Sequence, residues 1–184
     1  MFKEIDFATN LLSGPHKDSG LANAFRQARE LKKGQVFTSK FQSYVPSYGA
    51  PAAFIATPIV DGTTKLGVLV FQIPVNRIDR IMTNNSKWQE VGLGQTGETY
   101  LVGADKTLRS NRRLYLEDKR AYLDLVRQSA GADIAAKLGR VGTAIGIQSI
   151  DTPSVNLALQ GESGYLDYVD YSDRRALSAY TLLD

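Results

Sequence analysis

The stretch that decides the fold covers residues 53–74 and has the sequence AFIATPIV (53–60), DGTT (61–64), KLGVLVFQI (65–73) and P (74). Its two apolar runs are rich in β-branched and aromatic residues, which favour strands. The Asp61-Gly62 pair between them is typical of a tight hairpin connection. Pro74 lies where a helix can begin, because proline is tolerated at the first helical position. The stretch therefore predicts two antiparallel strands followed by a helix.

Upstream of this hairpin the sequence predicts a helix, a strand and a loop. Asp18 or Ser19 supplies an N-cap oxygen for the helix, and Gly34 supplies its stop. One face of this helix is apolar at helical spacing: Leu21, Ala24, Phe25, Ala28 and Leu31. Alternation predicts a half-buried strand at Gln35–Phe41, and the prolines and glycine of residues 44–51 predict a loop.

Downstream, a polar segment around Trp88 is expected to separate two modules. Beyond it, the expected elements are a hairpin (99–102 with 107–110), helices at 119–128 and 134–138, a helix capped at Thr152-Pro153, and strands at 165–171 and 175–182. The expected elements of the whole chain are thus helices and antiparallel strands.

Composition excludes several classes of site. The chain has 184 residues, of which 43% are hydrophobic and 22% charged. It has no cysteine, which excludes disulfides, thiolate metal sites and cysteine nucleophiles. Its one histidine, His16, has no second histidine with which to form a metal site or a catalytic pair. We therefore predict no metal, no cofactor and no enzymatic activity.

The positive charge is concentrated in one segment. The chain carries a net charge of +3. Residues 106–120 hold two acidic residues, Glu117 and Asp118, and six basic ones: Lys106, Arg109, Arg112, Arg113, Lys119 and Arg120. Guanidinium groups could grip an anion here, or the segment could be a solvated loop paired in part with its own carboxylates. Only Tyr115 interleaves with the basic residues, so we predict no nucleic-acid binding.

Residues 92–97 read GLGQTG and match the pattern G-x-G-x-x-G. A dinucleotide site needs this loop to follow a strand and to open a helix. Here a polar segment precedes the loop, and the strand-like residues Thr99–Val102 follow it. We therefore interpret it as a flexible loop leading into a strand, not as a nucleotide site.

Several strings, in this order, resemble the double Cache (PAS-like, PDC) sensor domain of bacterial methyl-accepting chemotaxis receptors. They are KEIDFATNL (3–11), Gly14-Pro15, SGLA (19–22), YVPS (44–47), PAAFIA (51–56), GVL (67–69), QIP (72–74), GQTGETYLVG (94–103), Arg109-Ser110, Arg113 and LSAY (177–180). The resemblance implies that residues 1–83 are a partial membrane-distal module. It implies that residues 84–184 are a membrane-proximal module lacking its last strand.

The resemblance implies an α+β, PAS-like fold with antiparallel sheets flanked by helices, and it also implies a function. It implies an extracytoplasmic ligand-binding domain at the periplasmic face of the bacterial inner membrane, in a full-length receptor that spans the membrane and forms a homodimer. Its ligand would be a small molecule: an amino acid, an organic acid or an amine. The alternatives are the sensor region of a histidine kinase or nucleotide cyclase, and a dimerisation or interaction module that binds no ligand.

Residues expected to line a ligand pocket follow from this hypothesis and from residue type. Tyrosines are prominent among them because the ring combines an apolar body with a polar tip. In the distal module they are Tyr44, Tyr48, Phe54 and Thr57. In the proximal module they are Tyr100, Arg109, Tyr168, Asp170 and Tyr180. Arg109 is expected to act as an anion clamp and Asp170 as an acceptor for an amine.

Overall fold

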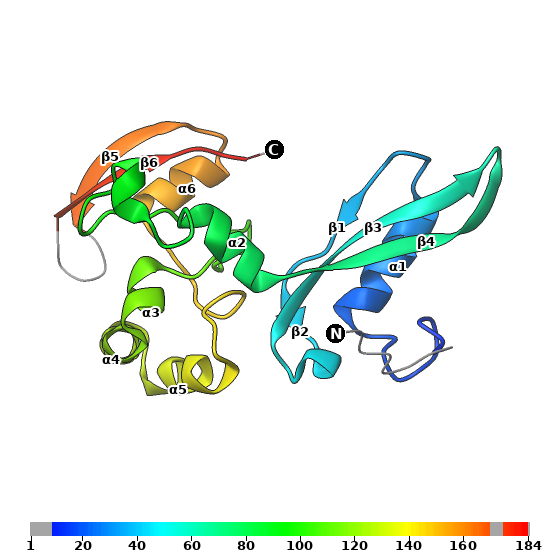
Figure 1. Cartoon of the computed structure of the whole chain (residues 1–184), viewed down its shortest axis with the longest axis horizontal. Coiled ribbons are helices and arrows are strands. Elements are labelled where there is room, and N and C mark those ends of the chain that lie inside the picture. The colour runs from blue at the N-terminus through cyan, green and yellow to red at the C-terminus, as the bar shows by residue number, and fades with distance from the viewer. Residues whose placement is uncertain (1–8, 170–174, 184) are drawn as a thin grey trace. The chain divides into compact units, whose positions relative to one another are not determined.

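The structure is a computed structural model that describes residues 9–169 and 175–183. The chain divides into two compact units, Met1–Arg77 and Ile78–Asp184. Each unit combines helices with an antiparallel sheet (Figure 1), which confirms the predicted α+β fold with antiparallel sheets flanked by helices.

The predicted hairpin forms the centre of the first unit. Strand β3 (Pro51–Asp61) pairs antiparallel with β4 (Thr64–Ile73) from Ala53↔Ile73 to Asp61↔Thr64. Gly62 lies in the connection with φ 55°, a left-handed conformation that glycine adopts without steric cost. The hairpin prediction is confirmed.

Two short strands pair with the opposite edge of β3. They are β1 (Phe37–Thr38) and β2 (Gln42–Ser43). The expected seven-residue strand at Gln35–Phe41 is wrong, because the pairing ends at Ser39. There the Ser39 hydroxyl accepts a hydrogen bond from the Phe54 N–H at 2.9 Å. The Ser39 side chain thus binds the Phe54 N–H, which would otherwise donate to a backbone carbonyl if the strand pairing continued. Within the expected loop 44–51, residues Val45–Ser47 form the short 3-10 helix η1.

The helix predicted upstream is α1 (Gly20–Glu30), and it covers one face of this sheet. The Ser19 hydroxyl caps it by accepting from the Ala22 N–H at 3.2 Å. The core beneath the helix consists mainly of alanines around one aromatic ring: Ala24, Ala28, Ala52, Phe54 and Ala56. These small side chains allow the helix to lie close to the sheet.

Helix α2 (Val75–Met82) begins directly after Pro74, as predicted, and the boundary between the two units falls inside it. Three successive residues beyond it are left-handed: Asn84, Asn85 and Ser86, with φ of 47°, 57° and 66°. Such a run is unfavourable for residues that carry a Cβ. It is followed by the 3-10 helix η2 (Trp88–Val91), in which the Trp88 ring is buried.

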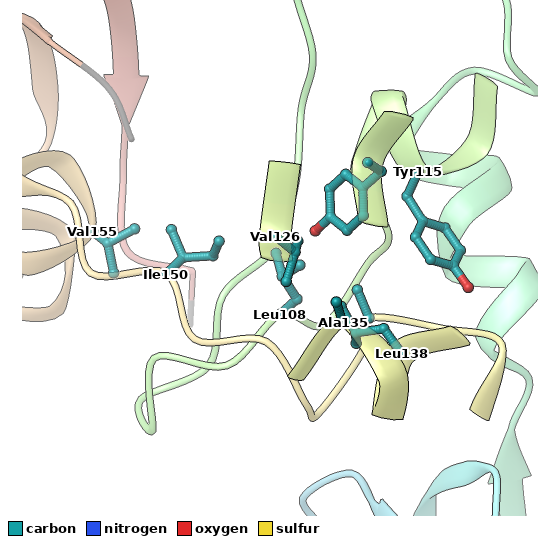
Figure 2. Packing of buried hydrophobic residues seen from close by; sticks show 9 residues of the cluster. Leu108, Tyr115, Val126, Ala135, Leu138, Ile150 and Val155 are labelled. Atoms are coloured by element: carbon teal, nitrogen blue, oxygen red, sulfur yellow. The ribbon is translucent and has the colours of Figure 1, made fainter. Parts of the chain in front are cut away.

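The second unit is built around a helical core. Its helices are α3 (Arg113–Glu117), α4 (Lys119–Ser129), α5 (Ala132–Val141) and α6 (Pro153–Leu159). Figure 2 shows the buried side chains between them, including Tyr115, Val126 and Leu138. The Tyr115 and Tyr122 rings meet edge to face at 5.3 Å. The Asp118 carboxylate caps α4 by accepting from the Ala121 N–H. The Thr152 hydroxyl caps α6 by accepting from the Val155 N–H, as predicted.

The sheet of the second unit has two described strands, β5 (Gly164–Val169) and β6 (Arg175–Tyr180), and α6 packs against both (Figure 1). The two strands were predicted. The hairpin expected at residues 99–102 and 107–110 forms only next to its turn. The antiparallel bridge Val102↔Leu108 is present, with backbone hydrogen bonds from Gly103 to Thr107 and from Arg109 to Leu101, but no longer ladder forms. Leu108 exchanges backbone hydrogen bonds with Gly146 and Gln148 instead, so the second half of the expected hairpin is drawn toward another loop.

Candidate functional site

The four residues expected to line a pocket in the first unit do not converge on one point. The Tyr44 and Phe54 rings meet edge to face at 5.1 Å, and Phe54 is buried in the core beneath α1. Tyr48 is 90% exposed. The Thr57 hydroxyl donates to the Gln35 carbonyl at 2.8 Å. Three of the four thus serve local packing or loop anchoring.

In the second unit, two of the expected residues come together. The half-buried residues Tyr100 and Tyr168 lie close enough for Tyr168 to affect the ionisation of Tyr100, although 68 positions separate them in the chain. Burial raises the pKa of Tyr100 to about 12; Tyr168 and Glu98 add to the rise, and the Arg112 cation opposes it. Tyr100 is therefore a neutral hydroxyl at any physiological pH. Tyr180 lies on the same face of the hairpin as Tyr168, because alternate residues of the paired strands share a face.

A buried ion pair underlies this tyrosine pair. The Arg112 guanidinium lies 5.0 Å from the centre of the Tyr100 ring, within the range of a cation–π contact. Its Nε donates to Glu98 Oε1 at 2.8 Å, and its Nη2 donates to the same oxygen. The other oxygen, Oε2, accepts from the Arg113 backbone N–H at 3.0 Å. We call Tyr100, Tyr168, Arg112 and Glu98 the tyrosine–arginine cluster.

Arg113 holds the loop with the G-x-G-x-x-G pattern. Its Nη1 donates to the carbonyls of Gly94 and Gly97 at 3.0 and 2.9 Å, and its Nε donates to Glu117 at 2.9 Å. The guanidinium also lies 4.6 Å from the Trp88 ring. A phosphate site would need loop amides turned toward the ligand, whereas these carbonyls are turned toward a cation of the chain itself.

The interpretation of residues 106–120 as a solvated loop is wrong for Arg112 and Arg113. Their exposed fractions are only 8% and 9%, because each guanidinium is enclosed with a carboxylate and an aromatic ring. The expected pairing of this segment with Glu117 is confirmed. Glu98 was missed, since a carboxylate 14 residues away carries no sequence signal that marks it as a partner.

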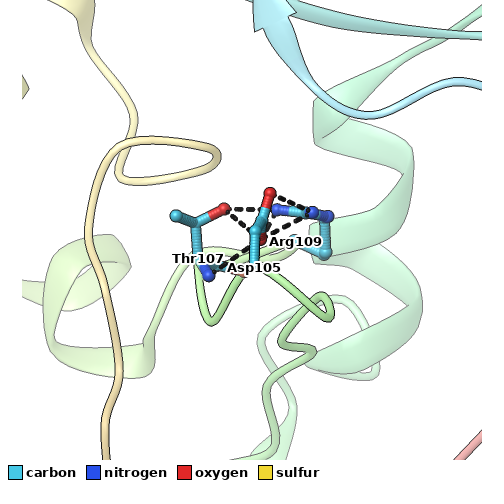
Figure 3. A network of polar contacts seen from close by, with 3 residues as sticks. All are labelled: Asp105, Thr107 and Arg109. Atoms are coloured by element: carbon cyan, nitrogen blue, oxygen red, sulfur yellow. Dashed lines mark hydrogen bonds and ion pairs between the residues drawn. The ribbon is translucent and has the colours of Figure 1, made fainter.

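Arg109, the expected anion clamp, is occupied by its own turn (Figure 3). Its Nη2 donates to both oxygens of Asp105, at 2.8 and 2.9 Å, and its Nη1 donates to the Thr107 carbonyl at 3.1 Å and to the Thr107 hydroxyl. A ligand anion would have to compete with Asp105 for this guanidinium. The clamp stays a prediction, as does the role of Asp170, which lies outside the described residues.

The turn in Figure 3 should make stability depend on pH. Partial burial acts to raise the pKa of Asp105, but hydrogen bonds from Arg109 and Thr107 outweigh it and lower the pKa to about 2. A depressed folded-state pKa gives stability that is present above the unfolded value and is lost as pH falls. Because this carboxylate is a third exposed, we expect a loss of about 1 kcal/mol between roughly pH 5 and pH 2. Comparing urea unfolding of the wild type and Asp105→Asn across that range measures it, and equal pH slopes would contradict it.

A second polar network fixes the start of the second unit. Asp79 accepts from the backbone N–H and the Nδ2 of Asn111, at 2.7 and 2.8 Å. The Asn111 Oδ1 accepts from the Thr143 hydroxyl at 3.0 Å and from the Ala144 N–H at 2.8 Å. The Asn111 side chain is thus engaged at both its nitrogen and its oxygen, so it joins α2 to the segment after α5 rather than presenting a free group to a ligand.

Within residues 9–169 and 175–183, no three or more His, Cys, Asp or Glu side chains gather as metal ligands would. Among the helices of this described part, none has the length and apolarity needed to cross a membrane. Comparison with known proteins gives no match: no family model, no curated protein and no solved structure matches the chain.

Proposed function

We propose that the chain is the ligand-binding sensor domain of a membrane receptor of the chemotaxis type, located on the periplasmic face of the bacterial inner membrane. Three points support the proposal: the sequence resemblance to double Cache domains, the α+β architecture of two units, and the tyrosine–arginine cluster. The cluster is the observation that carries most, because it brings together two residues, Tyr100 and Tyr168, that the sequence analysis expects to line a ligand pocket.

The cluster offers complementary chemistry to a small polar ligand. The two tyrosine hydroxyls can each donate and accept, and the Arg112–Glu98 pair places both signs of charge beside Tyr100. An amino acid, an organic acid or an amine could each use part of this set. A ligand that contacts both Tyr168 on β5 and Tyr100 would link two segments of the second unit. If it binds one arrangement of these segments more tightly, it shifts the population toward that arrangement.

A thermal-shift screen of amino acids, organic acids and amines tests the proposal. A ligand at one hundred times its Kd stabilises the folded state by about 2.7 kcal/mol. For any hit, Tyr168→Phe should weaken binding about tenfold, because it removes one hydroxyl and leaves the ring. Tyr165→Phe is the matched control, since Tyr165 lies on the same strand and is 82% exposed. A flat screen, or equal effects of the two variants, would contradict the proposal.

A dimerisation or interaction module is the second candidate, and one observation favours it. The β3–β4 hairpin carries four exposed large apolar side chains on one face: Ile55, Ile59, Leu69 and Phe71. The two functions are compatible, because ligand binding in the second unit and association through the first use different residues. If the signalling part of the receptor were a histidine kinase or a nucleotide cyclase, the same residues would bind the ligand.

A further inference from the structure

The ion pairs of this protein are distributed unevenly between its two units. In the part of the chain that the structure describes, every ion pair joins two residues of the second unit: Lys87–Glu90, Lys106–Asp151, Arg109–Asp105, Arg112–Glu98, Arg113–Glu117, Arg127–Asp124 and Arg175–Asp167. The first unit holds nine basic and five acidic residues, a net charge of +4, whereas the second holds 13 and 14, a net charge of −1. The excess positive charge therefore lies in the unit whose described cations form no ion pair.

The basic segment 106–120 is not where this excess charge is available. Four of its six basic side chains lie in ion pairs, and a fifth, Lys119, lies 5.6 Å from the centre of the Tyr115 ring. A carboxylate in contact with a cation cancels most of the field of that cation at a distance. The densest positive run of the sequence is thus largely neutralised in the folded chain, and the first unit has to supply any cationic surface.

Exposed cations gather in the first unit where α1 ends. They are Arg29, Lys32, Lys33 and Lys65, which we call the cationic end. Arg29 lies in the last turn of α1, with its guanidinium 5.7 Å from the centre of the Phe25 ring. Lys65 lies near the start of β4, and its Nζ donates to the Arg29 carbonyl. This contact holds the β3–β4 turn beside the end of the helix (Figure 1).

Stabilisation of the helix accounts for only part of the cationic end. A cation near a helix C-terminus is favourable because the last carbonyls carry partial negative charge, and Lys65 acts in this way directly. Lys32 and Lys33 lie beyond the helix, next to a hydrogen bond from the Gln35 N–H to the Lys32 carbonyl. Among the described residues, neither of these two ammonium groups has a carboxylate or a carbonyl partner. Both are therefore available to a group from outside the chain.

We propose that the cationic end binds a carboxylate-rich segment of another protein. Guanidinium and ammonium groups bind carboxylates through charge-assisted hydrogen bonds. The exposed carboxylates Glu30 and Asp61 lie at the same end of the unit, and a peptide can place uncharged residues opposite them. The phosphates of a bilayer or a nucleic acid form a continuous negative array that cannot avoid these two carboxylates. The residues involved are separate from the tyrosine–arginine cluster, so this binding does not depend on the proposed sensor function.

The expected affinity is low, because all four cations are exposed to water. An exposed ion pair contributes little and is screened by salt. Four such pairs together give a Kd of about 1 mM in low salt. The affinity should fall about fivefold or more when NaCl is raised from about 20 mM to about 300 mM, because the added salt shortens the range of the attraction.

A titration of the isotope-labelled full chain, followed by its amide NMR shifts, tests the proposal and locates the binding. The probe is a capped peptide of four Glu-Glu-Gly repeats, which carries carboxylates separated by neutral residues. The amides of residues 29–35 and 64–66 should shift and saturate. Shifts concentrated in residues 106–120 would overturn the proposal, because they would show that the paired segment is the one that binds. The absence of any saturating shift would also overturn it.

Reversal of charge at the two unpartnered lysines tests their role. Lys32→Glu combined with Lys33→Glu should weaken binding of the peptide about tenfold or more. The matched control combines Arg120→Glu with Lys137→Glu, two exposed cations on helices of the second unit that form no ion pair with a described residue. Each double variant lowers the net charge of the chain by four, so general attraction falls equally in both. Equal weakening by the two variants would contradict a local site.

The same titration with two other polyanions distinguishes the class of partner. One is a vesicle of phosphatidylglycerol and phosphatidylcholine, and the other is an oligothymidylate with eight phosphates, which matches the charge of the peptide. Both should bind the wild-type chain more weakly than the peptide does. If either bound as tightly as the peptide or more tightly, the cationic end would be a surface for phosphates, and the proposed peptide partner would be wrong.

Discussion

Replacing Arg113 with alanine should lower the free energy of unfolding by about 2–3 kcal/mol, because its buried side chain packs on the Trp88 ring and donates to three acceptors. The change would leave Glu117 without its ion pair and would free two loop carbonyls, those of Gly94 and Gly97. It would also remove the cation stacked on the buried Trp88 ring. Urea unfolding measures the loss.

Two further variants separate the cause of this loss from a general effect of losing an arginine. Arg127→Ala removes an exposed arginine that pairs with Asp124, and should cost about 0.5 kcal/mol or less. Arg113→Lys keeps the charge, but the lysine ammonium lacks the planar fork with which arginine reaches two carbonyls and a carboxylate at once. This variant should therefore recover only part of the loss. If Arg113→Ala cost no more than Arg127→Ala, the loop would not depend on this cation.

Replacing Asn111 with alanine should lower the free energy of unfolding by about 2–4 kcal/mol, because several buried partners lose their hydrogen bonds together. The Thr143 hydroxyl and the Ala144 N–H would lose their acceptor, and Asp79 would lose one of its two donors. Urea unfolding again measures the loss. The control is Asn156→Ala, which removes an exposed amide that donates to Asp151.

Asn111→Asp distinguishes the network from simple loss of packing. The new carboxyl would face the carboxylate of Asp79, and a like charge raises the pKa of one member of such a pair. A raised folded-state pKa means that stability is lost as pH rises. The deficit of this variant should therefore shrink when the solution is made acidic. A deficit that is constant with pH would argue that Asn111 acts only by filling space.

Local signals predicted most of the secondary structure. The N-caps at Ser19 and Thr152 and the helix start after Pro74 depend on residues within one turn, and the β3–β4 hairpin depends on a short turn between apolar runs. Failures occurred where a distant partner decided the outcome. Ser39 ends the expected first strand by binding Phe54, and Leu108 pairs with residues 146–148 instead of extending the hairpin.

The candidate site was predicted in the same uneven way. Residue type was enough to nominate Tyr100 and Tyr168, and the structure brings them close together. Residue type could not show that Arg112 and Arg113 are buried while their neighbour Arg109 closes a turn. The three lie in one short basic segment, but Arg109 pairs with Asp105 four residues before it, whereas Arg112 pairs with Glu98, which is 14 residues away in the chain.

The left-handed run at Asn84, Asn85 and Ser86 has a consequence for which sequences the chain can accept. A left-handed backbone admits glycine freely, asparagine and aspartate readily, and β-branched residues hardly at all. In a saturation library, these three adjacent positions should therefore enrich for glycine, asparagine and aspartate. They should reject valine and isoleucine, although Asn85 and Ser86 are exposed. Selection at this point of the chain acts on the backbone torsion rather than on what the side chains touch.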